Sequence, residues 1–190
     1  MSKRIVGVFV GSLRKKSYSR QVANTLKTLA PEDLALEFIE LGDLEMYNQD
    51  LDDEGRVPAS WSRFREHVKQ LDAVLFVTPE YNRSIPAILK NALDIGSRPF
   101  GQNVWNGKPG AVISVSPGAL GAFGANHLFR QSLVVLNIPT MQQPEAYIGN
   151  VAKLYDDEGH LISEKTRDYL NSIIRAFAAW INTNLGNGGI

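Results

Sequence analysis

Apolar runs of strand length alternate along this chain with longer runs in which apolar residues recur at helical spacing. The strand-like runs cover residues 5–10, 34–41, 73–78, 110–115 and 138–141. The helix-like runs cover residues 19–29, 58–70, 86–95, 125–136 and 163–182. Such alternation is typical of a parallel sheet that carries helices on both of its faces. The sequence therefore predicts an α/β fold with a doubly wound five-stranded parallel sheet.

This order of elements predicts the flavodoxin-like version of that fold. The run at 34–41 alternates only in part, which places it near an edge of the sheet. Residues 42–57 read as a long polar loop whose acidic run is solvated. A chain of 190 residues fits one domain spanning residues 1–190.

Charge and composition exclude several classes of protein. Twenty Lys and Arg residues balance twenty Asp and Glu residues, so no global field favours nucleic acid or an anionic membrane. We expect neither a signal peptide nor a membrane helix, and hence a cytoplasmic protein. The chain contains no cysteine, which excludes disulfides, thiolate nucleophiles and iron–sulfur clusters. Any redox chemistry would need a cofactor to carry the electrons.

The loop at 11–19 joins the first predicted strand to the first predicted helix. It contains Ser12, Arg14, Ser17 and Ser19 but matches neither G-x-G-x-x-G nor the nucleoside-triphosphate P-loop. Hydroxyls, a cation and free amides at a helix N-terminus are suited to a phosphate group. The alternative is an exposed basic turn whose serines only cap the helix.

Two further loops are expected at the same edge of the sheet, at 79–82 and 116–122. Tyr81 offers an aromatic face, Asn82 an amide, and the loop at 116–122 a hydroxyl with several glycines. A planar ring that ends in one phosphate would span all three loops, and flavin mononucleotide (FMN) fits that description. Taken singly, these residues could instead form a turn, a core-capping aromatic and a flexible loop.

The strings at 11–15 (GSLRK), 78–82 (TPEYN) and 86–94 (PAILKNALD) resemble the NADPH-dependent FMN reductase family. Within that family, the bacterial chromate and quinone reductases are the most similar. The resemblance implies a bound FMN that is reduced by NADPH or NADH. It also implies electron transfer to small-molecule acceptors, namely quinones, flavins, dyes and metal oxyanions such as chromate.

The same resemblance assigns the cofactor-binding residues. The phosphate-binding positions are Ser12, Arg14, Ser17 and Ser19. The positions around the flavin ring are Pro79, Glu80, Tyr81 and Asn82, with Ser116, Pro117 and Gly118 on the other side. No protein residue is expected to be catalytic, because hydride transfer takes place at the flavin N5, and ping-pong kinetics are expected. No metal site is expected, since His67, His127 and His160 lack a metal-ligand spacing.

Arg83 departs from the family pattern, in which tyrosine often follows the PEYN string. It places an additional cation near the predicted site, where it could favour anionic acceptors or pair with a neighbouring carboxylate. The resemblance also implies a homodimer or homotetramer in which a second subunit helps to enclose the flavin. Residues 144–147 and the helix that contains Arg130 are the candidate interface segments. Neither nucleic acid nor a membrane is an expected partner.

Two other functions share the predicted fold. A flavodoxin-like electron carrier would hold FMN without a hydride donor of its own, but such carriers are usually strongly acidic and this chain is neutral. A receiver-type signalling domain would need a cluster of aspartates at the strand ends. This chain places serine, glutamate and serine there instead.

Overall fold

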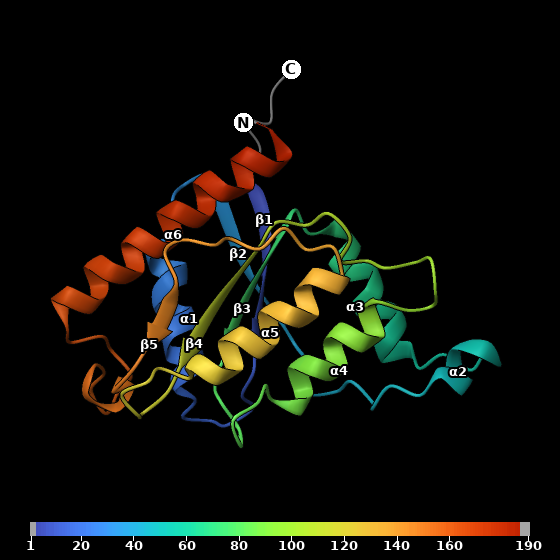
Figure 1. Cartoon of the computed structure of the whole chain (residues 1–190), viewed down its shortest axis with the longest axis horizontal. Helices are drawn as coiled ribbons and strands as arrows, with labels where there is room; N and C mark the ends of the chain where they lie inside the picture. Colours follow the sequence, from blue (N-terminus) through green and yellow to red (C-terminus); the bar gives the residue numbers. More distant parts are fainter. Residues whose placement is uncertain (1–2, 187–190) are drawn as a thin grey trace.

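The computed structural model describes residues 3–186, which form a twisted parallel sheet covered by helices (Figure 1). The strands are β1 (Arg4–Val10), β2 (Leu34–Ile39), β3 (Ala73–Thr78), β4 (Gly110–Val115) and β5 (Ala146–Ile148). The helices are α1 (Tyr18–Leu29), α2 (Gln49–Asp53), α3 (Ala59–Gln70), α4 (Ala87–Gly96), α5 (Phe123–Val135) and α6 (Glu164–Leu185), with a 3-10 turn at Val151–Lys153. In this part of the chain no helix is both long and apolar enough to span a bilayer.

The strands lie in the order β2-β1-β3-β4-β5, and every neighbouring pair is parallel. This order confirms the predicted flavodoxin-like sheet, with β2 at an edge. The chain winds outward in one direction from β1 and in the other from β3. The loops that follow these two strands therefore diverge and leave a crevice at the carboxyl edge of the sheet.

Alternating side chains of the strands divide the core into two layers. Val6, Val8 and Val10 of β1 pack with residues of α1 and α6 on one face of the sheet. Phe9 points to the other face, where it packs with residues of α3, α4 and α5. β3 and β4 are buried along their whole length, as expected of central strands between two layers of helices.

The predicted fifth strand was misplaced. Residues 138–141 contact β4 only at its start, where Thr140 forms an isolated bridge with Gly110. Met141 N–H donates to Gly110 O at 2.8 Å, but Pro139 has no N–H group, so the pairing does not extend toward the start of this segment. The chain instead joins the sheet at β5, where Ala146 pairs with Ile113 and is fully buried.

The segment at 42–57 is also more ordered than predicted. It contains α2, whose N-cap Asn48 accepts a hydrogen bond from Asp50 N–H at 3.1 Å. Asp52 is not solvated, because its side chain is 2% exposed. Its two carboxylate oxygens accept hydrogen bonds from Nη1 and Nη2 of Arg65, each at 2.7 Å. This buried pair fastens α2 to α3, and the short helix lies at the right-hand margin of Figure 1.

Gly11 sets how closely the loops after β1 and β3 approach each other. Its N–H donates to Val77 O at 2.9 Å, one residue beyond the end of β1. A Cβ atom at Gly11 would lie 2.7 Å from Leu89 Cδ1 and 2.8 Å from Pro79 Cδ. Glycine is therefore required at this position by close packing rather than by backbone conformation.

Replacing Gly11 by alanine is expected to destabilise the fold by about 1–3 kcal/mol, because the added methyl overpacks the junction of the two loops. Gly42→Ala is the matched control, since a Cβ atom there would meet Leu13 at 3.5 Å, an ordinary contact. Urea unfolding measures both variants. Equal stabilities for the two variants would show that the junction at Gly11 tolerates a side chain.

Candidate functional site

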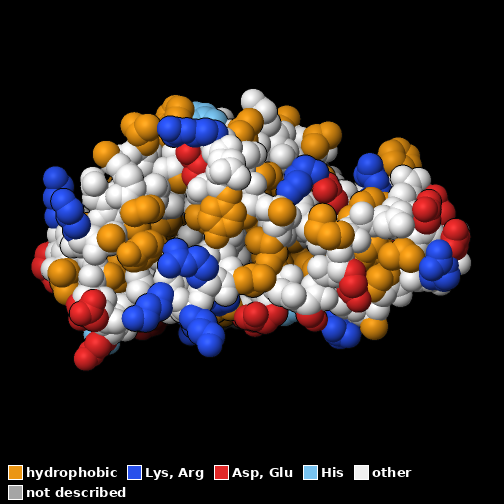
Figure 2. All heavy atoms as spheres, turned by 90° about the horizontal axis from the view of Figure 1, so that it is seen from below, with side chains coloured by type: hydrophobic (Ala, Val, Ile, Leu, Met, Phe, Trp, Pro, Cys, Tyr) orange, Lys and Arg blue, Asp and Glu red, His pale blue; other side chains and the backbone are white. Residues whose placement is uncertain are grey.

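The loops after β1, β3 and β4 meet at the carboxyl edge of the sheet and enclose a pocket of about 230 Å³. Nine of the eleven residues expected to bind the cofactor line it: Ser12, Arg14, Ser17, Ser19, Pro79, Glu80, Tyr81, Ser116 and Pro117. Figure 2 looks onto this edge and shows Lys and Arg side chains beside exposed hydrophobic ones. The structure thus brings together residues that are separated by about a hundred positions in the sequence.

One end of the pocket is built from the first loop and the start of α1. Ser17 caps the helix, with its Oγ accepting from Arg20 N–H at 3.2 Å. Within residues 3–186, the N–H groups of Tyr18 and Ser19 donate to no other protein atom. Ser12 and Ser19 are nearly buried and still line the pocket. These hydroxyls and amides are suited to an anion at the positive end of the helix dipole.

The second loop closes into a tight hairpin. Tyr81 and Ser84 exchange two backbone hydrogen bonds of 3.0 Å, and the two residues between them have φ values of +51° and +65°. Asn82, the first of these, occupies a turn position and lies outside the pocket lining. Tyr81 does line the pocket, and its hydroxyl lies 3.4 Å from Ser12 Oγ, so it connects the second loop to the first.

Glu80 lines the pocket but directs its carboxylate toward α5. Oε2 accepts from Ala125 N–H at 3.0 Å in the first turn of that helix, and Oε1 accepts from Arg83 at 3.3 Å. The carboxylate therefore satisfies the Ala125 N–H group and lies at the positive dipole end of α5. This role fixes the second loop against α5.

The third loop is held from beneath by a buried polar network. Ser114 Oγ lies 2.7 Å from Gly121 O, and Asn126 Nδ2 donates to Ser114 Oγ at 3.2 Å. At the top of the loop Ser116 Oγ accepts from Gly118 N–H at 3.0 Å. Gly118 itself is exposed and does not line the pocket, whereas Ser116 does.

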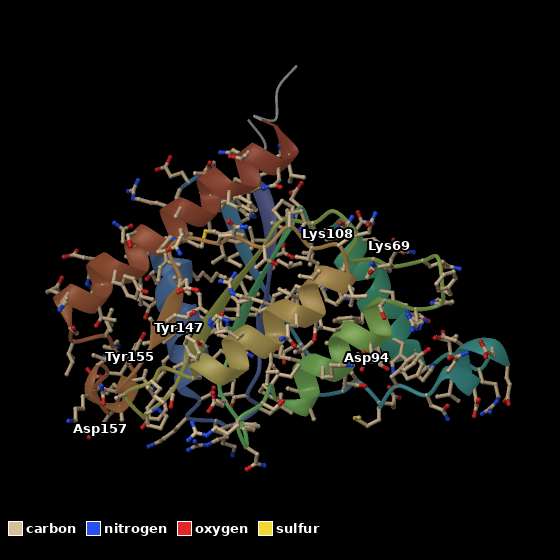
Figure 3. All side chains as sticks on the ribbon, in the orientation of Figure 1. Lys69, Asp94, Lys108, Tyr147, Tyr155 and Asp157 are labelled. Atoms are coloured by element: carbon tan, nitrogen blue, oxygen red, sulfur yellow. The ribbon has the colours of Figure 1, made fainter. Side chains whose placement is uncertain are left out.

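A cluster of aromatic rings lies beside the third loop. Tyr147 of β5 packs against Gly121, where a Cβ atom would lie 2.9 Å from Tyr147 Cβ (Figure 3). Its hydroxyl lies 3.0 Å from His127 Nε2, and its ring centre is 5.3 Å from that of Phe123. Burial raises the pKa of Tyr147 to about 12, with a further contribution from Glu145. The phenol is therefore protonated near neutral pH.

Sequence reasoning missed two residues of the lining, Tyr18 and Val115. Tyr18 is the first residue of α1, directly after the capping serine, and Val115 ends β4, directly before Ser116. Both are neighbours of predicted residues. Val115 would have been found by extending the third loop one residue back into β4. Tyr18 would have been found by including the residue that lies between Ser17 and Ser19.

Other hollows on the described part of the chain are larger but have less suitable linings. One of about 400 Å³ is bordered by Lys69 and Lys108 near the opposite edge of the sheet (Figure 3). The Lys108 ammonium donates to Lys69 O at 3.2 Å and so caps the end of α3, while burial lowers its pKa. This lysine has a structural partner, and none of the residues that line the hollow lies at a helix N-terminus.

The pocket lining fits FMN. Hydroxyls, amides and Arg14 at one end would bind a phosphate, while Tyr81, Pro79 and Val115 supply flat or apolar walls for a ring. The anion-binding end lies at the N-terminus of α1, and the apolar walls come from the end of β4 and from the loop after β3. The lining therefore has an anion-binding end and an apolar end, just as FMN has a phosphate at one end and a ring at the other.

Comparison with known proteins agrees with this assignment. The family model for NADPH-dependent FMN reductase matches residues 4–153. A quinone reductase of Pseudomonas putida is 59% identical over 179 residues, covering 94% of this chain and 95% of its own. A 2-hydroxy-1,4-benzoquinone reductase of a Burkholderia species is 44% identical over 176 residues, covering 93% and 95%.

Solved structures give the same result. The flavoenzyme FerB, an NAD(P)H:acceptor oxidoreductase of Paracoccus denitrificans, superposes with a TM-score of 0.89 at 41% identity, covering 95% of this chain and 98% of its own. A flavodoxin of Pseudomonas aeruginosa superposes with a TM-score of 0.54 at 17% identity, covering 92% and 99%, and so shares the fold. The chain belongs to the NADPH-dependent FMN reductase family.

Proposed function

We propose that the protein is an FMN-dependent NAD(P)H oxidoreductase whose acceptors are quinones. The observation that carries this proposal is the pocket itself, in which an anion-binding helix N-terminus and apolar walls lie side by side at the carboxyl edge of the sheet. Membership of the FMN reductase family and the names of the quinone-reducing relatives support it.

The first loop would bind the FMN phosphate. The N–H groups of Tyr18 and Ser19 point outward from the start of α1, and the Ser12 and Ser19 hydroxyls lie beside them in the lining. Arg14 would add a charged fork that can reach a phosphate oxygen. These groups are in place before the ligand arrives, because Ser17 already caps the helix.

The remaining walls would orient the ring. Tyr81 is held by its hairpin and by Ser12, and Pro79 by its contact with Gly11, so neither has to move to contact a ligand. When bound there, the flavin would accept hydride from a reduced nicotinamide and deliver electrons to a quinone. No acid, base or nucleophile of the protein is required for that transfer, and positioning is the contribution of these residues.

Further features belong to this proposal. Because the loops enclose one opening, donor and acceptor would occupy it in turn, which gives ping-pong kinetics. Free flavins, dyes and metal oxyanions such as chromate would be additional acceptors that need only contact with the exposed ring edge. We place the enzyme in the cytoplasm, where reduced nicotinamides are available.

Anaerobic spectroscopy of the FMN-loaded protein tests the proposal. We expect the flavin band to survive desalting, to bleach on addition of NADPH or NADH, and to return on addition of a quinone. Initial-rate plots for two substrates should be parallel.

Arg14→Ala should weaken FMN binding by about 1.5–3 kcal/mol, since a charge-assisted bond is lost. Lys15→Ala is the control, because this exposed side chain of the same loop does not line the pocket.

Other outcomes identify the alternatives. A retained band that neither nucleotide bleaches would indicate an electron carrier. A protein that retains no flavin and has no measurable affinity for it would contradict the proposal and favour a cofactor-free domain of the same fold. Intersecting lines in the kinetic plots would contradict the shared opening.

We also propose that a second copy of the chain covers α5. This helix buries Phe129 and Leu133 against the sheet, yet Val134 and Val135 on its outer face are 79% and 81% exposed. The adjoining loop leaves Phe100 95% exposed, and Asn103 of that loop bonds to Leu136 O at 2.9 Å. A helix that is apolar on both faces is typical of a buried position. Arg130, in contrast, is held within the protomer by Asn126 and Met141.

The oligomeric state tests this interface. Sedimentation of the unmodified protein should show a homodimer or homotetramer, and Val134→Lys with Val135→Lys should shift it toward the monomer. The control is Ile162→Lys, which changes another exposed apolar side chain on a different segment. A monomeric unmodified protein, or variants that all behave alike, would contradict an interface at α5.

A further inference from the structure

The mouth of the pocket is more basic than the rest of the molecule. The three loop segments 11–19, 79–84 and 116–122 contain four cations and one carboxylate in a chain that is neutral overall. The cations are Arg14, Lys15, Lys16 and Arg83, and all four are exposed. The one carboxylate, Glu80, is already engaged by the N-terminus of α5. An approaching anion therefore meets a positive field at this edge.

Arg83 differs from the other three cations in its place. The others lie on the first loop, next to the proposed phosphate site, whereas Arg83 belongs to the hairpin that forms the ring side of the pocket. Its backbone is fixed, because the hairpin closes with two hydrogen bonds and a Cβ atom on Gly124 of α5 would lie 3.4 Å from Arg83 O. The guanidinium extends from this fixed base and its side chain is 82% exposed.

The charge of Arg83 is only weakly neutralised. Its polar contact within residues 3–186 is Glu80 Oε1 at 3.3 Å. The other oxygen of that carboxylate accepts from Ala125 N–H, so the α5 dipole shares the negative charge. An exposed ion pair of this kind is weak and can be exchanged for a stronger partner. A phosphate that accepts two parallel N–H bonds from the guanidinium is such a partner.

The bound cofactor decides which part of a substrate reaches this cation. FMN would occupy the pocket of about 230 Å³, so a nicotinamide dinucleotide could only stack its nicotinamide on the exposed face of the ring, and its adenosine half would lie outside, over the rim. A small neutral quinone would stack on the same face and leave the rim uncovered. NADPH and NADH differ only in the 2′-phosphate on the adenosine half, which is the part that would lie on the rim.

We infer that Arg83 is the residue that selects NADPH over NADH, by binding the 2′-phosphate at the mouth of the pocket. This inference rests on the proposed function, since it concerns the donor of that reaction. Lys15 and Lys16 would add to the field, but Arg83 alone offers a planar fork from a fixed hairpin. Arg83 stands where tyrosine is frequent in the family, and on this inference the arginine sets donor specificity.

Titration calorimetry of NADP⁺ and NAD⁺ with the FMN-loaded protein tests the inference directly. Arg83→Gln should weaken NADP⁺ about fivefold and leave the affinity for NAD⁺ unchanged, because an exposed charge-assisted contact is removed. Arg83→Lys, which keeps the charge, should recover part of the loss. The control Arg175→Gln removes an exposed guanidinium on α6 and should change neither affinity. The kcat/KM for NADPH should fall in parallel, more so at low salt.

The contrary results are distinct. Equal losses for both nucleotides, or none for either, would overturn the role of Arg83 while leaving the proposed function intact. With NADH as donor, a loss in Arg83→Gln seen only with a quinone sulfonate, and not with a neutral quinone, would assign the cation to the acceptor instead. An unmodified protein that binds neither nucleotide and whose flavin neither reduces would overturn the proposed function and this inference together.

Discussion

The parallel pairing of β1 with β3 is the constraint on which the site depends. Val6 to Val10 of β1 pair with Ala73 to Val77 of β3, and Gly11 N–H extends the ladder to Val77 O. Because the chain leaves these neighbouring strands toward opposite ends of the sheet, the two following loops diverge around a crevice. The absence of a side chain at Gly11 allows Pro79 to approach, so the loops stay close at their bases. Strand order alone therefore produces the crevice, and the polar side chains only line it.

Polar groups then hold the loops in position. Glu80 joins the second loop to α5, and the Ser114–Asn126 pair anchors the third loop at Gly121. These contacts satisfy the Ala125 N–H group of α5 and the Gly121 C=O group of the third loop. In the hairpin, Asn82 and Arg83 both have positive φ values although neither is glycine. Such a conformation persists only where the surroundings fix it. Rigid loops of this kind can orient a flat ligand without reorganisation.

Much of this could be predicted from the sequence because it depends on local patterns. The buried runs at β1, β3 and β4 predicted the centre of the sheet, and the serines and arginine between β1 and α1 predicted an anion-binding loop. The run at 138–141 was mistaken for the fifth strand because its residues suit a strand, although it forms a single bridge with β4 and the ladder is made at Ala146–Ile148 instead. Asp52 was read as solvated because its partner Arg65 is thirteen residues away, on another helix. The carboxylate of Glu80 likewise takes its role from a helix N-terminus 45 residues away.

The central claim is that the loop between β1 and α1 recognises the phosphate of a flavin mononucleotide. Comparing the Kd values of FMN and riboflavin for the apoprotein tests it most directly, because the two ligands share the ring and differ in the phosphate. The amides of Tyr18 and Ser19, the neighbouring hydroxyls and Arg14 predict FMN binding about 100-fold tighter than riboflavin binding. Equal affinities would contradict the account, because they would show that the ring alone carries the binding and that the loop is only a capped turn.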